Sequence, residues 1–145
     1  MNAKLLHDSD GRRVWALVFD KGDEAVAGLE AFARQERVHA AHFTAIGAFS
    51  EATLGYFDRG RSDYDRIPVS EQVEVLSLVG DIALQDGEPT VHAHAVLGRR
   101  DGTTIGGHLF EGRVWPTLEL FLSAEPAALE KREDEETGLF LIDAS

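Results

Sequence analysis

Three of the six histidines in this 145-residue chain lie close together in the sequence, at His92, His94 and His108. His92 and His94 are two residues apart, so in a β-strand both side chains point to the same face. Imidazole is a common ligand of zinc and similar divalent transition metals, and catalytic zinc sites typically have three protein ligands and one open position. If His108 reaches the same face, the pattern predicts a metal site. The alternative is three polar histidines that only form hydrogen bonds.

The turn between the two histidine segments decides where His108 lies. A two-residue loop would turn His108 to the opposite face from His94. A three-residue loop over residues 100–102, with Gly102 in the left-handed region, would place His94 directly opposite His108. Directly opposed residues have Cβ atoms about 4.5–5.5 Å apart, close enough for two imidazoles to share one ion. We predict this three-residue loop, although the glycine pair at 106–107 would permit a bulge that shifts the register.

Two carboxylates lie inside apolar, strand-like segments, at Glu74 and Glu119. A carboxylate in such a setting can support a metal-bound histidine or carry a proton. Glu119 is the first candidate for proton transfer at the metal. The equally plain alternative is that both residues occupy solvent-facing positions of alternating strands. His39 and His42 have no matching partner and are interpreted as structural or exposed.

The segments around these residues predict an α+β fold of the α/β type, with a mostly antiparallel mixed sheet and one main helix. The helix is expected at about residues 23–37, with Asp20 or Asp23 as its N-cap. Its apolar stripe should pack on the sheet and comprises Val26, Leu29, Phe32 and Ala33. Strands are predicted at residues 4–7, 12–20, 42–46, 52–57, 73–84 (kinked near Gly80), 114–122 (Pro116 at an edge or bulge) and 138–142, together with the hairpin over 92–108.

The charge of the chain argues against nucleic acid as its main partner. There are 26 acidic and 14 basic residues, for a formal net charge of −12. Nucleic-acid binding usually requires an excess of lysine and arginine, because neutralisation of phosphates drives it. An Arg-Gly-Arg motif at residues 59–61 is of the kind that can enter a minor groove. Asp58, Asp63 and Asp65 surround this motif, which favours a solvated loop.

Composition also limits the metal ligands and the compartment. The chain has no cysteine, so a metal must be held by histidine and carboxylate, and disulfides are excluded. Residues 1–8 contain no long apolar run of the kind found in signal peptides or membrane spans. We therefore expect a cytoplasmic protein without a membrane partner. The length and the absence of repeats or linkers predict a single domain over residues 1–145.

Several segments together resemble the plants-and-prokaryotes-conserved (PPC) domain, a domain of unknown function in bacteria. The matching segments are residues 46–50, 52–57, 74–80, 87–94, 106–109 and 116–119. The resemblance covers residues 12–123 and leaves an acidic C-terminal segment, 125–145. It implies an antiparallel sheet, a homotrimer, and a metal site, zinc by first choice, at His92, His94 and His108. The fold is also similar to that of acetolactate decarboxylase, a zinc enzyme.

Three functional hypotheses follow from the pattern and the resemblance. The first is a cytoplasmic, homotrimeric PPC-domain protein that binds zinc or a similar divalent ion and acts on a small molecule, with lyase or hydrolase-like chemistry. The second is a DNA-binding or transcription-associated assembly module without catalysis, because plant members of the family occur in nuclear DNA-binding proteins. A purely structural metal is a third reading of the same histidines.

Overall fold

The computed structural model describes all residues from 1 to 145 and contains nine strands and one helix. In chain order the elements are β1 (Asn2–Ser9), β2 (Arg12–Phe19), α1 (Ala25–Glu36), β3 (Ala40–Asp58), β4 (Asp63–Val69), β5 (Val73–Gln85), β6 (Glu88–Gly98), β7 (Thr104–Ala124), β8 (Glu130–Glu133) and β9 (Phe140–Asp143). The result confirms an α+β fold with one main helix. No helix of the chain has the length and apolarity needed to cross a membrane.

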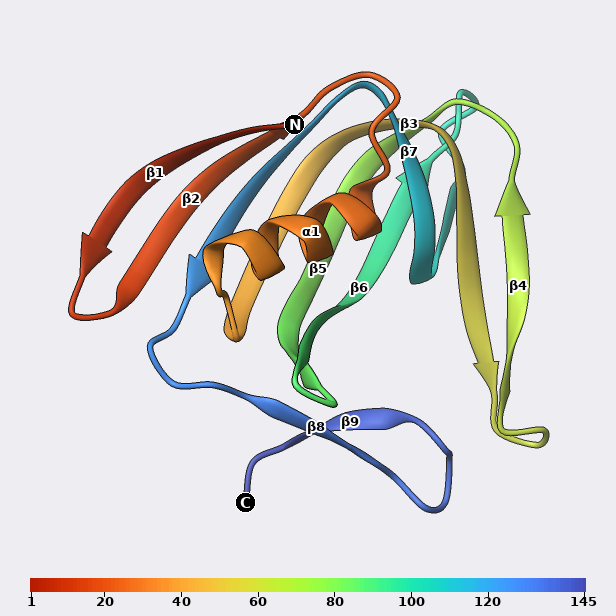
Figure 1. The fold of residues 1–145 in the computed structure, drawn as a ribbon. Coiled ribbons are helices and arrows are strands. Elements are labelled where there is room, and N and C mark those ends of the chain that lie inside the picture. Colours follow the sequence, from red (N-terminus) through yellow and green to blue (C-terminus); the bar gives the residue numbers. More distant parts are fainter.

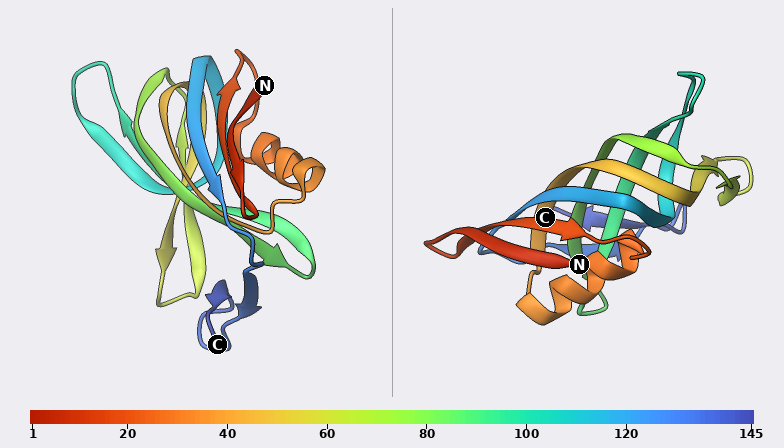
Figure 2. Two further views of the ribbon diagram at one scale, coloured as in Figure 1. Left: turned by 90° about the vertical axis from the view of Figure 1, so that its left-hand side faces the viewer. Right: turned by 90° about the horizontal axis from the view of Figure 1, so that it is seen from above.

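All strands belong to one strongly curved sheet, and α1 packs on one of its faces (Figures 1 and 2). The sheet order is β1-β2-β7-β3-β5-β8-β9, while β4 pairs with β3 and β6 pairs with both β5 and β7. Every pairing is antiparallel except that of β5 with β8. The long strands β3 and β7 each pair with three other strands: β3 with β4, β5 and β7, and β7 with β2, β3 and β6. They therefore connect the β1–β2 hairpin to the rest of the sheet.

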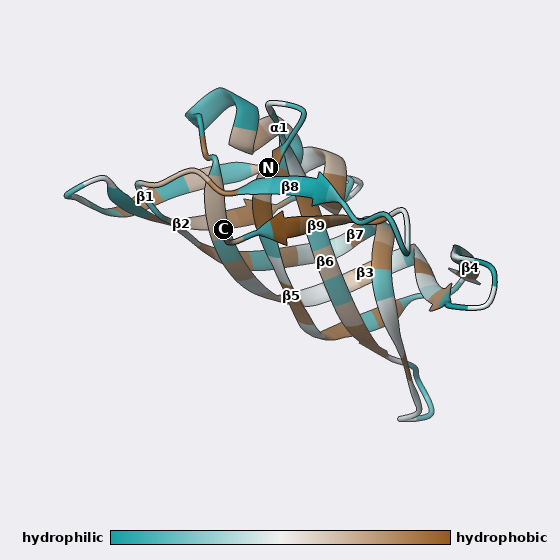
Figure 3. Cartoon of the chain, turned by 90° about the horizontal axis from the view of Figure 1, so that it is seen from below, coloured by the Kyte–Doolittle hydropathy of each residue, from teal (hydrophilic) through white to brown (hydrophobic).

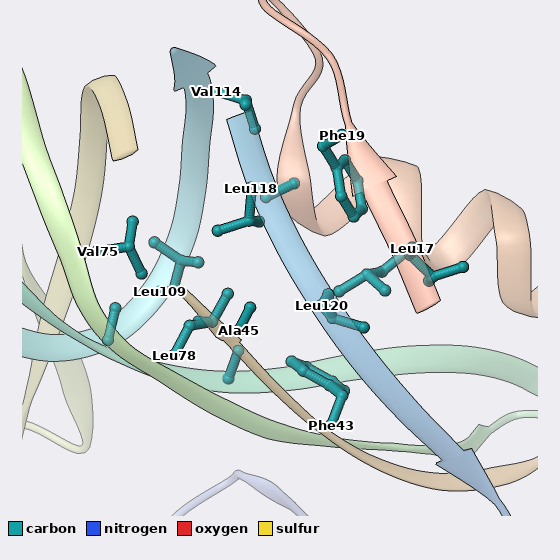
Figure 4. Close-up of a cluster of buried hydrophobic side chains, with 14 of the residues drawn as sticks. Leu17, Phe19, Phe43, Ala45, Val75, Leu78, Leu109, Val114, Leu118 and Leu120 are labelled. Carbon is teal, nitrogen blue, oxygen red and sulfur yellow. The ribbon is translucent and has the colours of Figure 1, made fainter. Parts of the chain in front are cut away.

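The hydrophobic core lies between α1 and the sheet face that it covers. Alternate residues of the central strands point into this core, as the period of two in a strand requires. Phe43, Leu120 and Leu17 come from three different strands and lie close together in it (Figure 4). The opposite face of the sheet, here called the outer face, is not covered by the helix. It carries the side chains of His92, His94 and His108.

The helix begins differently from the sequence-based expectation. Glu24, rather than Asp20 or Asp23, is the N-cap, and its carboxylate accepts a hydrogen bond of 2.7 Å from the backbone N–H of Ala27. The carboxylate of Asp23 instead accepts a hydrogen bond from the backbone N–H of Asp20. The expectation was wrong because several acidic residues in this segment are each able to cap. At the other end Arg37 adopts a left-handed conformation, with φ of 53°.

Two expected irregularities in the strands are placed more exactly by the structure. The β5–β6 register shifts between Val75 and Ser77, and it runs without a shift through Gly80. Gly80 is instead a site of close approach, because an added Cβ would collide with the carbonyl oxygen of His92 and the ring of Phe43. Pro116 lies at a bulge, as one of its two alternatives predicted, but within a long central strand and not at an edge.

The acidic C-terminal segment, 125–145, forms a hairpin of its own. β9 matches the predicted strand at 138–142, whereas β8 has no counterpart among the predicted strands. The two strands pair with each other, and β8 contacts the sheet where Glu130 meets Leu84 of β5. This C-terminal hairpin lies beneath β5 and β6, at the end of the sheet that carries His92 (Figures 1 and 3).

The close approach at Gly80 yields a test of the packing. We expect Gly80→Ala to lower the free energy of unfolding by about 2 kcal/mol or more, the order of magnitude for overpacking a well-filled interior. Gly60→Ala in the β3–β4 turn is the matched control, since a Cβ there would meet only the flexible carboxylate of Asp58. Urea denaturation of both variants measures the difference. Equal stabilities would contradict the packing described for β5.

Candidate metal centre

The antiparallel pairing of β6 with β7 aligns two of the histidines. His94 lies opposite His108, and the register continues without a shift to the end of the hairpin. The backbone N–H of Arg99 donates to the carbonyl of Thr103 at 2.8 Å, and Gly102 donates back to the carbonyl of Arg99 at 2.9 Å. Gly102 has a φ of 84°. These contacts confirm the three-residue loop over 100–102 and show that the neighbouring glycine pair introduces no bulge.

The three imidazoles meet in one cluster on the outer face. His92 Nε2 lies 3.2 Å from His94 Nε2, and one ring nitrogen from each of the three histidines lies within 4.8 Å of the others. With Zn–N bonds of about 2.0–2.1 Å, a tetrahedral ion separates its ligand nitrogens by about 3.3 Å. The spacing of His92 and His94 therefore fits a shared ion, and a small movement of the His108 ring would complete the set.

His108 is held in a form suited to binding a metal. Its Nδ1 is buried and has no hydrogen-bond partner in the chain, which costs free energy unless a bound ligand or ion supplies one. Burial, followed by the nearby charges of His92 and His94, lowers the pKa of His108 to about 4. The ring is therefore neutral near pH 7, and neutral imidazole is the form that binds metal.

A carboxylate lies behind the cluster. Asp81 Oδ2 is 3.3 Å from His92 Nδ1, on the side of the ring opposite the nitrogen that faces His94. Burial by itself would raise the pKa of Asp81, but the hydrogen bond to His92 and the charge of Lys131 outweigh it and lower that pKa. An ionised carboxylate at this position fixes the orientation of the imidazole and increases its basicity, as in many zinc sites.

Aromatic rings desolvate the other side of the cluster. The rings of Tyr64 and Phe110 lie 5.0 and 4.7 Å from the ring of His108, measured between centroids. Gly55 pairs with His108 across β3 and β7, and a side chain at Gly55 would collide with both aromatic rings. The glycine therefore makes the space that these rings occupy. Partial burial also lowers the pKa of His94.

The cluster opens into a hollow of about 430 Å³. Tyr64, Thr90 and Lys131 line it together with the three histidines, and residues 138–141 of the C-terminal hairpin form one wall. A volume of this size suits a small molecule. No aspartate or glutamate lines the hollow, although the chain as a whole is strongly acidic.

Glu119 and Glu74 lie elsewhere. Both line a separate hollow on the outer face together with Ile46 and Leu76, and Glu119 is exposed. β6 pairs directly only with the first part of β7. From His94 on β6, the strand pairings cross β5 and β3 before they reach the later part of β7 that contains Glu119, which is three strand spacings away along the sheet. At normal strand spacing this separation is roughly 14 Å. The structure therefore does not bring Glu119 to the three histidines.

Three neighbours of the cluster were missed by the sequence reasoning. Asp81 could have been found, because a two-residue turn at residues 86–87 sets Asp81 opposite His92. Tyr64 reaches the cluster from β4, and Lys131 reaches it from β8. No local signal in the sequence points to either residue, since both arrive through long-range contacts.

The fold and the cluster define a class: a curved, mostly antiparallel sheet with one helix and a three-histidine group on its outer face. The Plants and Prokaryotes Conserved (PCC) domain family matches residues 7–125 of the chain. The chain belongs to this family, which confirms the resemblance noted from its motifs.

Two solved structures share the fold over most of the chain. A metal-containing protein from Archaeoglobus fulgidus is 38% identical with a TM-score of 0.84, and the match covers 89% of this chain and 91% of that one. A candidate DNA-binding protein from Ralstonia eutropha JMP134 is 31% identical with a TM-score of 0.85, covering 90% and 91% of the two chains.

A curated relative has the domain as part of a longer protein. The bifunctional protein GlmU of Synechococcus sp. (strain JA-3-3Ab) is 36% identical over 113 residues. These residues make up 77% of this chain, which spans only 17% of the length of that relative.

The lowered pKa of His108 makes the stability of the metal-free protein depend on pH. The ring binds a proton near pH 6.5 when unfolded but only near pH 4 when folded, so unfolding takes up a proton between these values. The stabilising contribution is complete above pH 6.5 and is lost as the pH falls toward 4. In urea denaturation with a chelator present, we expect the wild type to lose more stability over this interval than His108→Asn. Parallel losses would contradict the assigned pKa.

Proposed function

We propose that this protein binds a divalent transition metal ion, zinc by first choice, through His92, His94 and His108. The observation that carries this proposal is the convergence of three imidazoles on one point, with Asp81 behind one of them and an unsatisfied nitrogen in another. The metal-containing relative from Archaeoglobus fulgidus supports it. We also propose a cytoplasmic location, which follows from composition alone.

We further propose that the metal site acts on a small molecule and is not only structural. Structural zinc sites are closed by four protein ligands, whereas this cluster offers three and opens into a hollow. A bound zinc ion would supply a Lewis acid able to polarise a carbonyl or activate water. The protein's own contribution is to hold His108 neutral, to orient His92 with Asp81 and to limit the access of water with aromatic rings.

The outer face supports the proposal of a homotrimer. Its exposed apolar side chains include Ile46, Leu76, Val79, Val96 and Phe121. Val79 pairs directly with His94, so this apolar area adjoins the histidine cluster. Extended apolar patches on a protein surface commonly mark contacts between chains. The number of three chains comes from the family resemblance.

Binding to DNA is the second candidate, favoured by the similarity to the candidate DNA-binding protein from Ralstonia eutropha JMP134. The net charge of −12 opposes it. Arg61 of the Arg-Gly-Arg motif forms ion pairs with Asp58 and Asp65, so its charge is already neutralised. Tight, sequence-dependent binding in a mobility-shift assay at physiological salt would reverse the order of the two proposals.

The metal proposal is tested by elemental analysis of the purified chain after zinc loading and gel filtration. We expect about one zinc ion per chain in the wild type and almost none in His94→Ala, because two imidazoles cannot hold the ion against dilution. Asp81→Asn should weaken zinc binding by roughly 10–100-fold. His7→Ala, an exposed histidine outside the cluster, is the control. A His94→Ala variant with unchanged zinc content would refute the site.

The oligomer proposal is tested by sedimentation of variants on the two faces of the sheet. Phe121 is 59% exposed on the outer face, and a charge there would have to be buried in the trimer. We expect Phe121→Asp to sediment as a smaller species than the wild type. Leu5→Asp provides a matched control, since Leu5 is similarly exposed in β1 but pairs with Trp15, whose side chain points to the core face. A monomeric wild type would contradict the proposal.

A further inference from the structure

Lys131 is a buried cation with few partners. Its side chain is only 5% exposed, and it lines the histidine hollow from β8, outside the residues that match the family. Burying an ammonium group costs free energy unless hydrogen bonds and opposite charge surround it. The ammonium has three N–H donors, yet its two nearest acceptors are distant, with Thr90 Oγ1 at 3.4 Å and Asp81 Oδ1 at 3.5 Å. The chain therefore satisfies Lys131 poorly.

The charge around the hollow is positive when the proposed metal is bound. Asp81 is the one carboxylate in contact with Lys131, and their single charges offset each other. A divalent ion on three neutral imidazoles then adds two positive charges, for which the lining residues provide no counter-charge. A negatively charged ligand would balance these charges and would also satisfy the free donors of Lys131.

The walls of the hollow restrict the kind of anion. Leu139, Phe140 and Leu141 line one wall, and the ring of Tyr64 lines another. Phosphate sites typically use an arginine fork or a run of backbone N–H groups, whereas Lys131 is the one lysine or arginine that lines this hollow, beside the neutral Tyr64, Gln85 and Thr90. One ammonium beside an apolar wall better suits a carboxylate attached to a small hydrocarbon group.

We infer that the histidine hollow binds a small organic carboxylate, whose carboxylate group contacts the ammonium of Lys131 and whose hydrocarbon part packs on residues 139–141. The location of this site next to the metal rests on the proposed function, but the cation that recognises the anion belongs to the chain itself. The C-terminal hairpin thus selects the ligand, while the family domain supplies the histidines.

The inference is tested by titrating the protein of residues 1–145 with isobutyrate and with isobutyramide, a neutral molecule of the same shape. Binding is followed by the NMR signals of the histidine rings, in zinc-loaded and in metal-free protein. We expect the wild type to prefer isobutyrate and Lys131→Gln to weaken isobutyrate binding by about tenfold or more, the effect of losing a charged hydrogen bond. Lys131→Arg should keep the preference for the anion.

Arg132→Gln is the matched control. It removes one positive charge from the same strand, but Arg132 is 71% exposed, pairs with Asp143 and does not line the hollow. Equal binding of isobutyrate to Lys131→Gln and Arg132→Gln would overturn the inference, as would tighter binding of inorganic phosphate than of isobutyrate. The wild type could instead take up no zinc, while its metal-free form still prefers isobutyrate in a way that depends on Lys131. That result would refute the proposed function and leave this inference standing.

Discussion

The antiparallel register between β6 and β7 is the constraint on which the candidate site depends. Because side chains alternate along a strand, a slip of one residue would turn His108 away from His94. The same slip would expose Ala95 and Leu97, which are buried on the core face of β6. The pairing that fills the core is therefore the pairing that aligns the imidazoles, and Gly102 closes the loop at the length that both require.

Close approach of strands shapes the surroundings of the histidines. Gly107 packs against the backbone of Gly55, and Gly55 leaves room for the rings of Tyr64 and Phe110. Those rings remove water from one side of His108, and burial is the main reason for its low pKa. Backbone packing thus sets the protonation state of the ring.

The distribution of charge gives the site its chemical character. Acidic residues outnumber basic ones in the chain, yet the hollow is lined by imidazoles, one ammonium, neutral polar side chains and apolar groups, with no carboxylate. The negative charge of Asp81 is turned toward His92 and Lys131, where it orients a ring and partly neutralises an amine. Two parts of the chain meet here: the family domain carries the histidines, and the C-terminal hairpin adds the cation and an apolar wall.

The sequence by itself determined the mostly antiparallel α+β fold, the helix and the alignment of His94 with His108, because strand alternation and turn length are local rules. Asp81 was also accessible to such rules, through the two-residue turn that sets it opposite His92. Only the tertiary structure decided that Lys131 and Tyr64 reach the cluster and that Glu119 does not. Alternation fixes the face on which a residue lies, but the distance between residues on that face depends on strand order and sheet curvature, which arise from long-range packing.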